Sequence, residues 1–435
     1  MQVVMASRSM LFQVLRSGMI YGVANVLAAG VPFMLLPVLT RALSPTEYGE
    51  VVSFFMLVSV TASLAGLSLH GAVGVRWLDA SKGDPKGYTR TAMLLVMLST
   101  TLAAGLIAIL GPLVGINLSA WVCGMAAVLA GCMALQGMRF TVWQSGQQAF
   151  PAATLQVASA VLGVSLSLVA VLMFNWGSLG RIGGAVVAGL IIAVFSVLSL
   201  SRLVGNSKPS CASVTALLRF GVPLIPHAMA GALLGSLDRF AVSAHLGTQT
   251  LGVYGVASQL GLVINVLADA VTKAFTPQIY RMLARNSTRD RLRVVALSYL
   301  SVPAWLLVAL VLWGGLLLGG ELLLGAKYLA AIDLTVWFLL GGALTGAYLN
   351  VAGLFFFTSK TEWISMATLT ACAISAVLAP WAAAHYGIKG AALSYCTSQA
   401  ILLIAVWVLS MRVKPMPWRR PGLALRVLAR SWRTR

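Results

Sequence analysis

Two arginines, Arg41 and Arg239, lie at matching positions in the two halves of the sequence. Each follows a Gly-Val pair and two prolines in an apolar stretch, and each precedes a Tyr-Gly pair. A guanidinium group presents a rigid fork of N–H donors that matches the oxygens of a phosphate. The repeat therefore predicts that both arginines contact an anionic group of a substrate. The alternatives are a structural ion pair for Arg239 and, for Arg41, a side chain that reaches the outer membrane interface.

Asp238 directly precedes Arg239 in the same apolar stretch. A charged group at membrane depth costs about 2.5–3.5 kcal/mol on insertion scales, so it is a functional candidate by default. Neighbouring residues on a helix do not face each other, so Asp238 needs a partner other than Arg239. We expect Asp238 either to carry a coupling ion or to pair with an arginine of the other half, such as Arg41.

Four further polar residues are candidates for coupling, gating or substrate contact. Asp269 and Lys273 are four positions apart, so they form either an ordinary ion pair on one helix face or a gate contact. His227 lies just inside an apolar stretch, where it acts either as a coupling group or as a neutral packing histidine. Arg139 lies near several glutamines after the fourth apolar stretch. That setting suits either a cytoplasmic entrance that binds sugars and headgroups or a solvated loop.

The four prolines of the repeat, Pro32, Pro37, Pro223 and Pro226, are expected to bend helices. A proline inside a membrane helix removes one backbone hydrogen bond and bends the helix there. Interrupted helices at matching places in the two halves of a transporter mark the transport pathway. Helix packing is the alternative explanation for each of these prolines.

The composition is that of a membrane protein. Of 435 residues, 59% are hydrophobic and 9% are charged, whereas a soluble domain has about 25% charged residues. The net charge of +20 is explained by basic cytoplasmic loops, and no segment between the apolar stretches has room for a nucleic-acid-binding module. The five cysteines form no CxxC pair, and the sequence contains neither a Gly-Lys-Ser/Thr nucleotide loop nor an HExxH motif. We therefore expect no metal, no cofactor and no enzyme active site.

About twelve apolar stretches are long enough to cross a bilayer as helices. They centre near residues 18–40, 49–70, 91–110, 119–138, 152–173, 183–201, 220–242, 251–271, 295–318, 334–357, 364–384 and 391–411. The links are short, so the predicted fold class is an all-α polytopic membrane protein. A polar segment divides it into two six-helix bundles, at residues 1–205 and 206–411, followed by a basic cytoplasmic tail at residues 412–435. For the tail we favour a positive-inside anchor, with binding to anionic lipid or to a partner enzyme as the alternative.

Lysines and arginines are distributed unevenly between the two sides of this arrangement. Of the 30 basic residues, all but five lie on the side that holds both termini. The five exceptions are Arg41, Arg181, Arg239, Lys327 and Lys389. Because cytoplasmic loops of membrane proteins are enriched in Lys and Arg, both termini are predicted to be cytoplasmic.

Several short segments resemble the polysaccharide transporter family. These are the O-antigen and exopolysaccharide repeat-unit flippases of the multidrug/oligosaccharidyl-lipid/polysaccharide exporter superfamily. In the first half the resemblance rests on Gly22, Asn25, Pro37, Thr40-Arg41-Ala42-Leu43 and Glu47-Tyr48-Gly49. In the second half it rests on the segment from Phe220 to Pro226, on Asp238-Arg239-Phe240, on Leu251-Gly252-Val253-Tyr254 and on Pro277. The resemblance covers residues 10–411, and the tail lies outside it.

The resemblance implies two six-helix bundles around a central cavity in the bacterial inner membrane. It implies that an undecaprenyl-diphosphate-linked oligosaccharide is translocated to the periplasmic leaflet by alternating access, for O-antigen, capsule or exopolysaccharide synthesis. The implied partners are this lipid-linked oligosaccharide, membrane lipids, a polysaccharide polymerase and glycosyltransferases, with H⁺ or Na⁺ as the coupling ion. It also implies that Arg41 and Arg239 are candidates for contact with the headgroup.

Two other classes of protein share some of these features. A drug/cation antiporter of the same superfamily would require acidic groups in the first bundle, but the first six spans contain no Asp or Glu in mid-span. A membrane glycan polymerase or acyltransferase would require catalytic residues in a sizeable periplasmic loop, but the outer links are short. Both observations favour the flippase.

Overall fold

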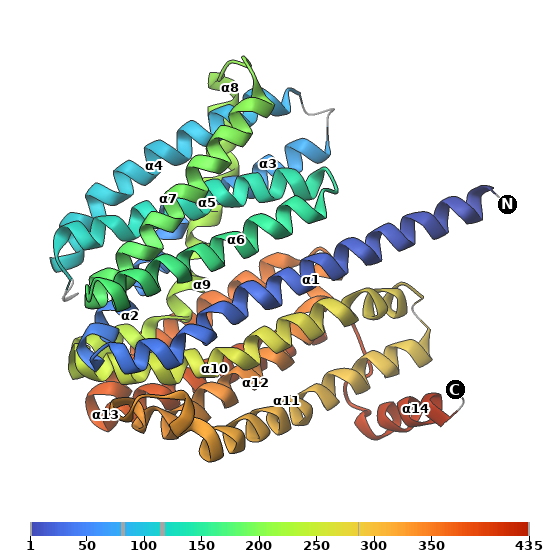
Figure 1. Cartoon of the computed structure of the whole chain (residues 1–435). Helices are drawn as coiled ribbons and strands as arrows, with labels where there is room; N and C mark the ends of the chain where they lie inside the picture. Colours follow the sequence, from blue (N-terminus) through green and yellow to red (C-terminus); the bar gives the residue numbers. More distant parts are fainter. Residues whose placement is uncertain (1, 80–82, 114–117, 286, 434–435) are drawn as a thin grey trace. The chain divides into compact units, whose positions relative to one another are not determined.

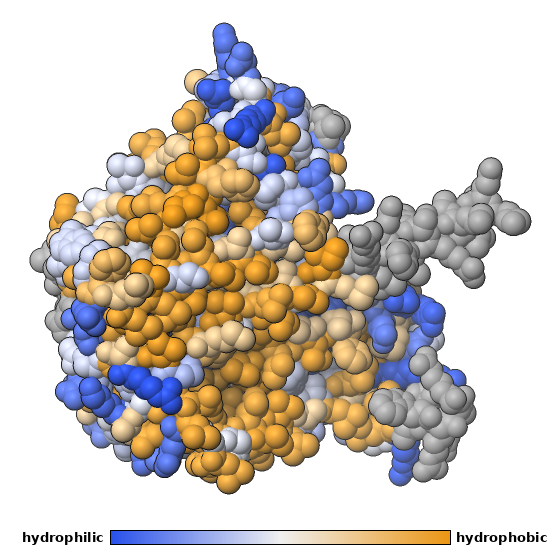
Figure 2. Space-filling model, in the orientation of Figure 1, coloured by the Kyte–Doolittle hydropathy of each residue, from blue (hydrophilic) through white to orange (hydrophobic). Residues whose placement is uncertain are grey.

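The computed structural model describes residues 2–79, 83–113, 118–285 and 287–433, and these form helices and turns without any strand. The chain divides into two compact units, residues 1–232 and residues 233–435. The visible surface is largely apolar (Figure 2), with many large hydrophobic side chains exposed. A protein surrounded by lipid tails has such a surface, so the predicted all-α polytopic fold class is confirmed.

The described residues of the first unit form nine α-helices with short connecting turns (Figure 1). They are α1 (Gln2–Ala42), α2 (Pro45–Gly66), α3 (Leu69–Leu78), α4 (Pro85–Leu113), α5 (Ala120–Ser145), α6 (Ala149–Leu168), α7 (Gly177–Val204), α8 (Cys211–Gly221) and α9 (Ile225–Leu234), which crosses the boundary between the units. A π-helical turn, Val169–Met173, extends α6, and a 3₁₀ turn, Val222–Leu224, separates α8 from α9. Helix α5 packs against α2, α3, α4 and α7, so it is the central helix of this unit.

The second unit contains the remaining five α-helices of the described chain. They are α10 (Leu237–Arg285), α11 (Thr288–Leu323), α12 (Ala330–Phe357), α13 (Thr361–Val413) and α14 (Pro421–Arg433), with a 3₁₀ turn, Ala326–Tyr328, before α12. Helix α12 packs against α10, α11 and α13. Two of these helices are kinked at a glycine with a positive φ, α10 at Gly247 (φ 84°) and α13 at Gly387 (φ 62°).

Eleven helical segments of the described chain are long and apolar enough to cross a membrane. The kink at Gly387 separates the last two predicted spans, which the structure joins as α13. The seventh predicted span is not one continuous helix, because the chain is interrupted at Val222–Leu224 and again between Leu234 and Leu237. Helix α3 was not predicted as a separate element, since the left-handed Leu67 and Ser68 that precede it carry no glycine or proline signal.

The compact units are divided at residue 232, beyond the predicted bundle boundary at residue 205. Helix α8 belongs to the first unit because it packs against α3 and α4, and its Leu217 is completely buried. The linker before α8 is also held by α4, since Arg90 Nη1 donates to the carbonyl of Gly205 (3.1 Å). The division into six and six spans remains a prediction about the repeat.

Helix α2 begins where the sequence contains a Ser-Pro-Thr-Glu signal. The Ser44 hydroxyl accepts from the backbone N–H of Glu47, and the Glu47 carboxylate accepts from the backbone N–H of Ser44. This reciprocal capping box satisfies two N–H groups at the helix start, and Pro45 suits the first helical position. The family-like Glu47 therefore has a structural role at this helix start.

Gly184 sets the distance between α6 and α7. A Cβ atom at Gly184 would lie 2.5 Å from the backbone nitrogen of Ser167 and 2.6 Å from its Cα. The neighbouring Gly183 has no atom within 4 Å of its corresponding Cβ position. Small residues that allow two backbones to approach closely are typical of membrane helix interfaces.

We therefore expect Gly184→Ala to destabilise the protein by about 1–3 kcal/mol, because the backbone of α6 must move away. Gly183→Ala is the matched control and should leave stability unchanged. The measurement is the thermal unfolding midpoint of the detergent-solubilised protein, followed by size-exclusion chromatography. Equal midpoints for the two variants would show that α6 and α7 are not packed this closely.

Candidate functional site

A group of amide and hydroxyl side chains lies between α1, α5 and α6 inside the first unit. Gln156 Nε2 of α6 donates to Asn25 Oδ1 of α1 (2.6 Å). Ser159 of α6 donates to Gln136 Oε1 of α5 (3.2 Å). The hydroxyl of Tyr21 on α1 is buried and has no hydrogen-bond partner. Neutral groups that both donate and accept are suited to hydrogen bonding with sugar hydroxyls.

Arg139 lies inside α5, where only 9% of its surface is exposed. Its guanidinium group lies 4.0 Å from the ring centroid of Trp143, and its Nε is buried without a hydrogen-bond partner. The cation–π contact offsets part of the cost of removing the charge from water. Arg139 is therefore not in a solvated loop; Gln147 and Gln148, beyond the end of α5, are exposed instead. The alternative of a solvated loop was wrong for Arg139, since the helix continues beyond it to Ser145.

The two arginines of the repeat make the same local hydrogen bond. Arg41 Nη1 donates to the carbonyl of Pro37, and Arg239 Nη1 donates to the carbonyl of Gly235, both at 3.2 Å and four residues back. Arg41 is exposed, whereas Arg239 is partly buried and its Nε has no hydrogen-bond partner. The repeat noticed in the sequence is thus also present in the side-chain geometry.

Asp238 is almost completely buried in the second unit, with 2% of its surface exposed. Its Oδ2 accepts a hydrogen bond from the hydroxyl of Tyr254 (2.7 Å), whereas its Oδ1 is buried without a partner. Both residues belong to α10, before and after the kink at Gly247. A buried carboxylate with one free oxygen is a site where a proton or a cation can bind.

Aromatic rings connect Tyr254, the partner of this carboxylate, to α12 and α13, and one polar pair also joins these two helices. The ring of Tyr254 packs against Phe338 of α12 (5.0 Å between centroids), and Phe338 packs against Tyr395 of α13 (5.2 Å). Thr345 donates to Gln399 Oε1 (3.2 Å), and this pair again joins α12 to α13. Buried polar groups in apolar surroundings constrain how the helices pack.

Asp269 and Lys273 form an ion pair on α10, with 2.6 Å between Oδ2 and Nζ. About half of each side chain is exposed, 51% and 56% respectively, and such surface pairs contribute little stability. The ordinary i,i+4 pair is therefore present, and a gate contact remains a prediction. His227 is partly buried on α9, and its Nδ1 has no hydrogen-bond partner.

The prolines of the repeat lie in different local structures. Helix α1 continues through Pro32 and Pro37. Pro223 lies in the 3₁₀ turn after α8, and Pro226 lies in the first turn of α9. The second pair therefore accompanies a break in the helix, and a role of the four prolines in the transport pathway remains a prediction.

Arg181 was predicted from the sequence only as one of the five basic residues on the side opposite the termini. Its guanidinium group lies 4.9 Å from the ring centroid of Phe55, and its Nη1 donates to the hydroxyl of Ser167 (3.0 Å). On the preceding turn of α7, Ser178 donates to a carboxylate oxygen of Glu50 on α2. The glycines at positions 180, 183 and 184 are the one local signal that this arginine enters a close helix interface.

Comparison with known proteins places these features in a family. Residues 14–283, more than half of the chain, match the family model described as "Polysaccharide biosynthesis protein". The chain is 24% identical over 372 residues to "Lsg locus putative protein 1" of Haemophilus influenzae, with 82% of this chain and 88% of that protein covered. It is 25% identical over 365 residues to an uncharacterised membrane protein of the same organism, with 82% and 87% covered.

Solved structures with this fold include transporters of two kinds. The structure titled "Lipid II flippase MurJ, inward closed conformation" aligns with a TM-score of 0.69 and 14% identity, covering 97% of this chain and 90% of that one. An inward-facing multidrug resistance transporter of the MATE family and the MOP superfamily aligns with a TM-score of 0.65 and 14% identity, covering 90% and 94%. At these identities the likeness concerns the fold.

Proposed function

Since the chain belongs to the polysaccharide biosynthesis protein family, as the resemblance in its sequence implied, we propose that it is a flippase for a lipid-linked oligosaccharide. The proposed cargo is an undecaprenyl-diphosphate-linked repeat unit, which crosses the bacterial inner membrane by alternating access. The product would serve O-antigen, capsule or exopolysaccharide synthesis. The observation that carries the proposal is the family match over residues 14–283 in a chain with a transporter fold, one that it shares with a lipid II flippase. A transporter, rather than an enzyme, is the role that this combination supports.

The polar groups of the first unit support an oligosaccharide as cargo. The amide pair Asn25–Gln156 and the pair Gln136–Ser159 offer both donors and acceptors, as sugar hydroxyls require. Arg139 provides a buried positive charge on α5. Arg41 and Arg239 are the proposed contacts for the diphosphate, because each presents a guanidinium fork near the end of a repeated, proline-marked apolar stretch.

A drug/cation antiporter of the same superfamily is the alternative. The polar group between α1, α5 and α6 contains amides and hydroxyls but no carboxylate among the residues that its hydrogen bonds join. Amides do not titrate, so this group favours a neutral, hydrogen-bonding cargo over a cationic drug exchanged for a proton.

The proposal is tested in liposomes that contain the purified protein and a fluorescent lipid-linked oligosaccharide. We expect the oligosaccharide to move between leaflets without nucleotide, as measured by its accessibility to an added lectin or reductant. A deletion strain should accumulate the same lipid-linked oligosaccharide on its cytoplasmic leaflet. Movement of a cationic dye without movement of the oligosaccharide would support the antiporter instead.

We further propose that both termini of this multi-pass protein are cytoplasmic, because the basic residues are concentrated on that side. Reporter fusions after Ser207 and after Arg412 should therefore be active with a reporter that works in the cytoplasm. The same fusions with a reporter that requires the periplasm should be inactive. Activity of the periplasmic reporter at either position would contradict the proposed topology.

A further inference from the structure

The C-terminal segment is folded against the second unit. The chain leaves α13 at Val413, and three hydrogen bonds hold the following residues. Lys414 Nζ donates to the carbonyl of Leu283 (3.5 Å), a guanidinium nitrogen of Arg291 donates to the carbonyl of Pro415, and the hydroxyl of Tyr299 donates to the carbonyl of Trp418 (2.9 Å). The segment is therefore attached to the ends of α10 and α11, where two membrane spans meet.

Apolar contacts fix which side of the segment faces the protein. Trp418 is 4% exposed, and its ring packs against those of Tyr299 and Trp407. Ala424 of α14 is completely buried, and Val427 packs on the same core cluster. The inner face of α14 is thus occupied by α11, and no further partner is needed on that side.

Exposed leucines lie on both flanks of α14, each roughly 100° from the buried Ala424. Leu423 and Leu425 of α14 are exposed, at 45% and 37% of their surface. Arg426 of α14 is exposed, and so are Arg419 and Arg420 directly before the helix. Residues 412–435 contain no Asp or Glu that could neutralise these charges. Helices with apolar and basic residues together lie at membrane interfaces, where the leucines enter the headgroup boundary and the arginines meet anionic lipid.

The starting point of α14 matches this location. The last membrane span ends at Val413, and α14 begins at Pro421 after a short segment that is itself buried at Met416 and Trp418. The helix is therefore held close to the end of a span and cannot extend far into the aqueous phase. Exposed leucines are unfavourable in water but favourable within the headgroup layer.

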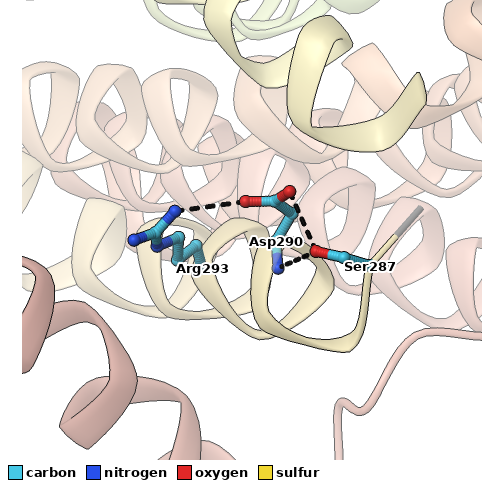
Figure 3. Close-up of polar contacts among 3 residues, drawn as sticks. All are labelled: Ser287, Asp290 and Arg293. Atoms are coloured by element: carbon cyan, nitrogen blue, oxygen red, sulfur yellow. Dashed lines mark hydrogen bonds and ion pairs between the residues drawn. The ribbon is translucent and has the colours of Figure 1, made fainter. Parts of the chain in front are cut away.

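The segment docks beside an ordered helix start. Figure 3 shows Asp290 between Ser287 and Arg293 at the beginning of α11. The Ser287 hydroxyl accepts from the backbone N–H of Asp290 (3.1 Å), and Asp290 Oδ1 pairs with Arg293 Nη1 (3.2 Å). Arg291, which holds Pro415, lies between these residues. The C-terminal segment is therefore attached to the first turn of α11 through Arg291.

From these contacts we propose that α14 and the two arginines before it bind anionic lipid headgroups, with Arg419, Arg420 and Arg426 as the contacting charges and Leu423 and Leu425 as the inserted side chains. The partner is the surface of the membrane in which the protein is embedded. Because each basic residue near an anionic surface contributes about fivefold to binding, three arginines and two leucines are sufficient for a stable but salt-sensitive attachment.

The experiment measures hydrogen exchange of the α14 backbone in the full-length protein, reconstituted in nanodiscs. One set contains phosphatidylcholine alone, and the other contains phosphatidylcholine with phosphatidylglycerol. We expect exchange across α14 to be about tenfold slower with the anionic lipid, and we expect high salt to remove most of this difference, since salt screens the attraction. Exchange in α12 should be the same in both sets.

A triple variant identifies the charges responsible. Arg419→Gln, Arg420→Gln and Arg426→Gln together should abolish the lipid-dependent slowing while leaving α14 docked through Ala424. The matched control removes three positive charges from the neighbouring ends of α10 and α11, through Arg281→Gln, Arg285→Gln and Arg289→Gln. These three arginines are also exposed. We expect the control variant to retain the lipid-dependent slowing of exchange in α14.

Equal exchange of wild-type α14 in neutral and anionic nanodiscs would overturn the proposal and leave a protein partner as the occupant of this surface. Slowing that persists in the Arg419/Arg420/Arg426 variant would also overturn it. If that variant fails to fold, the salt dependence of exchange in the wild type tests the proposal instead. An attachment without charge contacts would be insensitive to salt, and that result would overturn the proposal. None of these measurements depends on which cargo the protein transports.

Discussion

An Arg239→Ala variant should fail to restore glycan export in a deletion strain, although its abundance in the membrane remains near that of the wild type. Arg239 is partly buried, and its Nη1 donates to the neutral carbonyl of Gly235, so this hydrogen bond does not neutralise the positive charge that we propose for the anionic headgroup. Loss of a charged hydrogen bond to a phosphate costs about 1.5–3 kcal/mol, which corresponds to export that is roughly 10- to 150-fold slower. The measurement is the amount of surface glycan, with membrane abundance determined by immunoblotting.

Two substitutions separate substrate contact from the local hydrogen bond to Gly235. Arg239→Gln keeps an N–H donor but lacks the charge, so we expect normal abundance and no export. Arg239→Lys keeps the charge but loses the fork, so we expect partial export. Full export by the alanine or glutamine variant would mean that Arg239 only caps the carbonyl of Gly235.

Asp238→Asn should abolish the response of transport to an imposed ion gradient. The carboxylate is buried, Tyr254 donates to one of its oxygens, and the other has no partner. An asparagine still accepts the hydrogen bond from Tyr254 through its amide oxygen, so the fold should be retained. It can no longer bind a proton or attract a cation, and about 2.3 kcal/mol per charge and 100 mV would be lost as a driving force.

The measurement is the rate of oligosaccharide movement in liposomes with and without a membrane potential or a pH gradient. Tyr254→Phe is the comparison variant. It keeps the carboxylate but removes the hydrogen bond, so it should lower stability by about 1–3 kcal/mol and leave the gradient response in place. A response that survives in Asp238→Asn would assign coupling to another group, and a wild type that ignores both gradients would indicate facilitated movement.

Much of the fold could be predicted from the sequence because membrane spans are determined locally. Apolar length identified the spans, and the capping signal from Ser44 to Glu47 marks a helix start that is present in the structure. Gly247 and Gly387 lie in links that were predicted between spans, and only the structure shows that each link is a kink at a glycine with a positive φ. The break at Leu67 and Ser68 was also hidden, because both residues are ordinary ones in a left-handed conformation.

The candidate site was predicted less completely. Arg41, Arg239 and Asp238 stand out because charges are rare in apolar stretches. The burial of Arg139 and its contact with Trp143 could not be seen, because a polar sequence near a helix end fits a loop equally well. The pair Asn25–Gln156 joins residues that are 131 positions apart, and Arg181 reaches Ser167 only because α6 and α7 approach at Gly184.

The sequence by itself determined that this protein is a helical membrane protein, and the motifs around its two repeated arginines determined its resemblance to a flippase family. These properties follow from hydrophobic length, charge distribution and short motifs, each of which is contained in a continuous stretch of chain. Only the tertiary structure decided that Tyr254 is the partner of Asp238, that α8 belongs to the first unit and that the basic tail folds back onto α11. The reason is physical: a hydrogen bond or a close backbone contact depends on which helix faces meet, and that depends on packing across the whole unit.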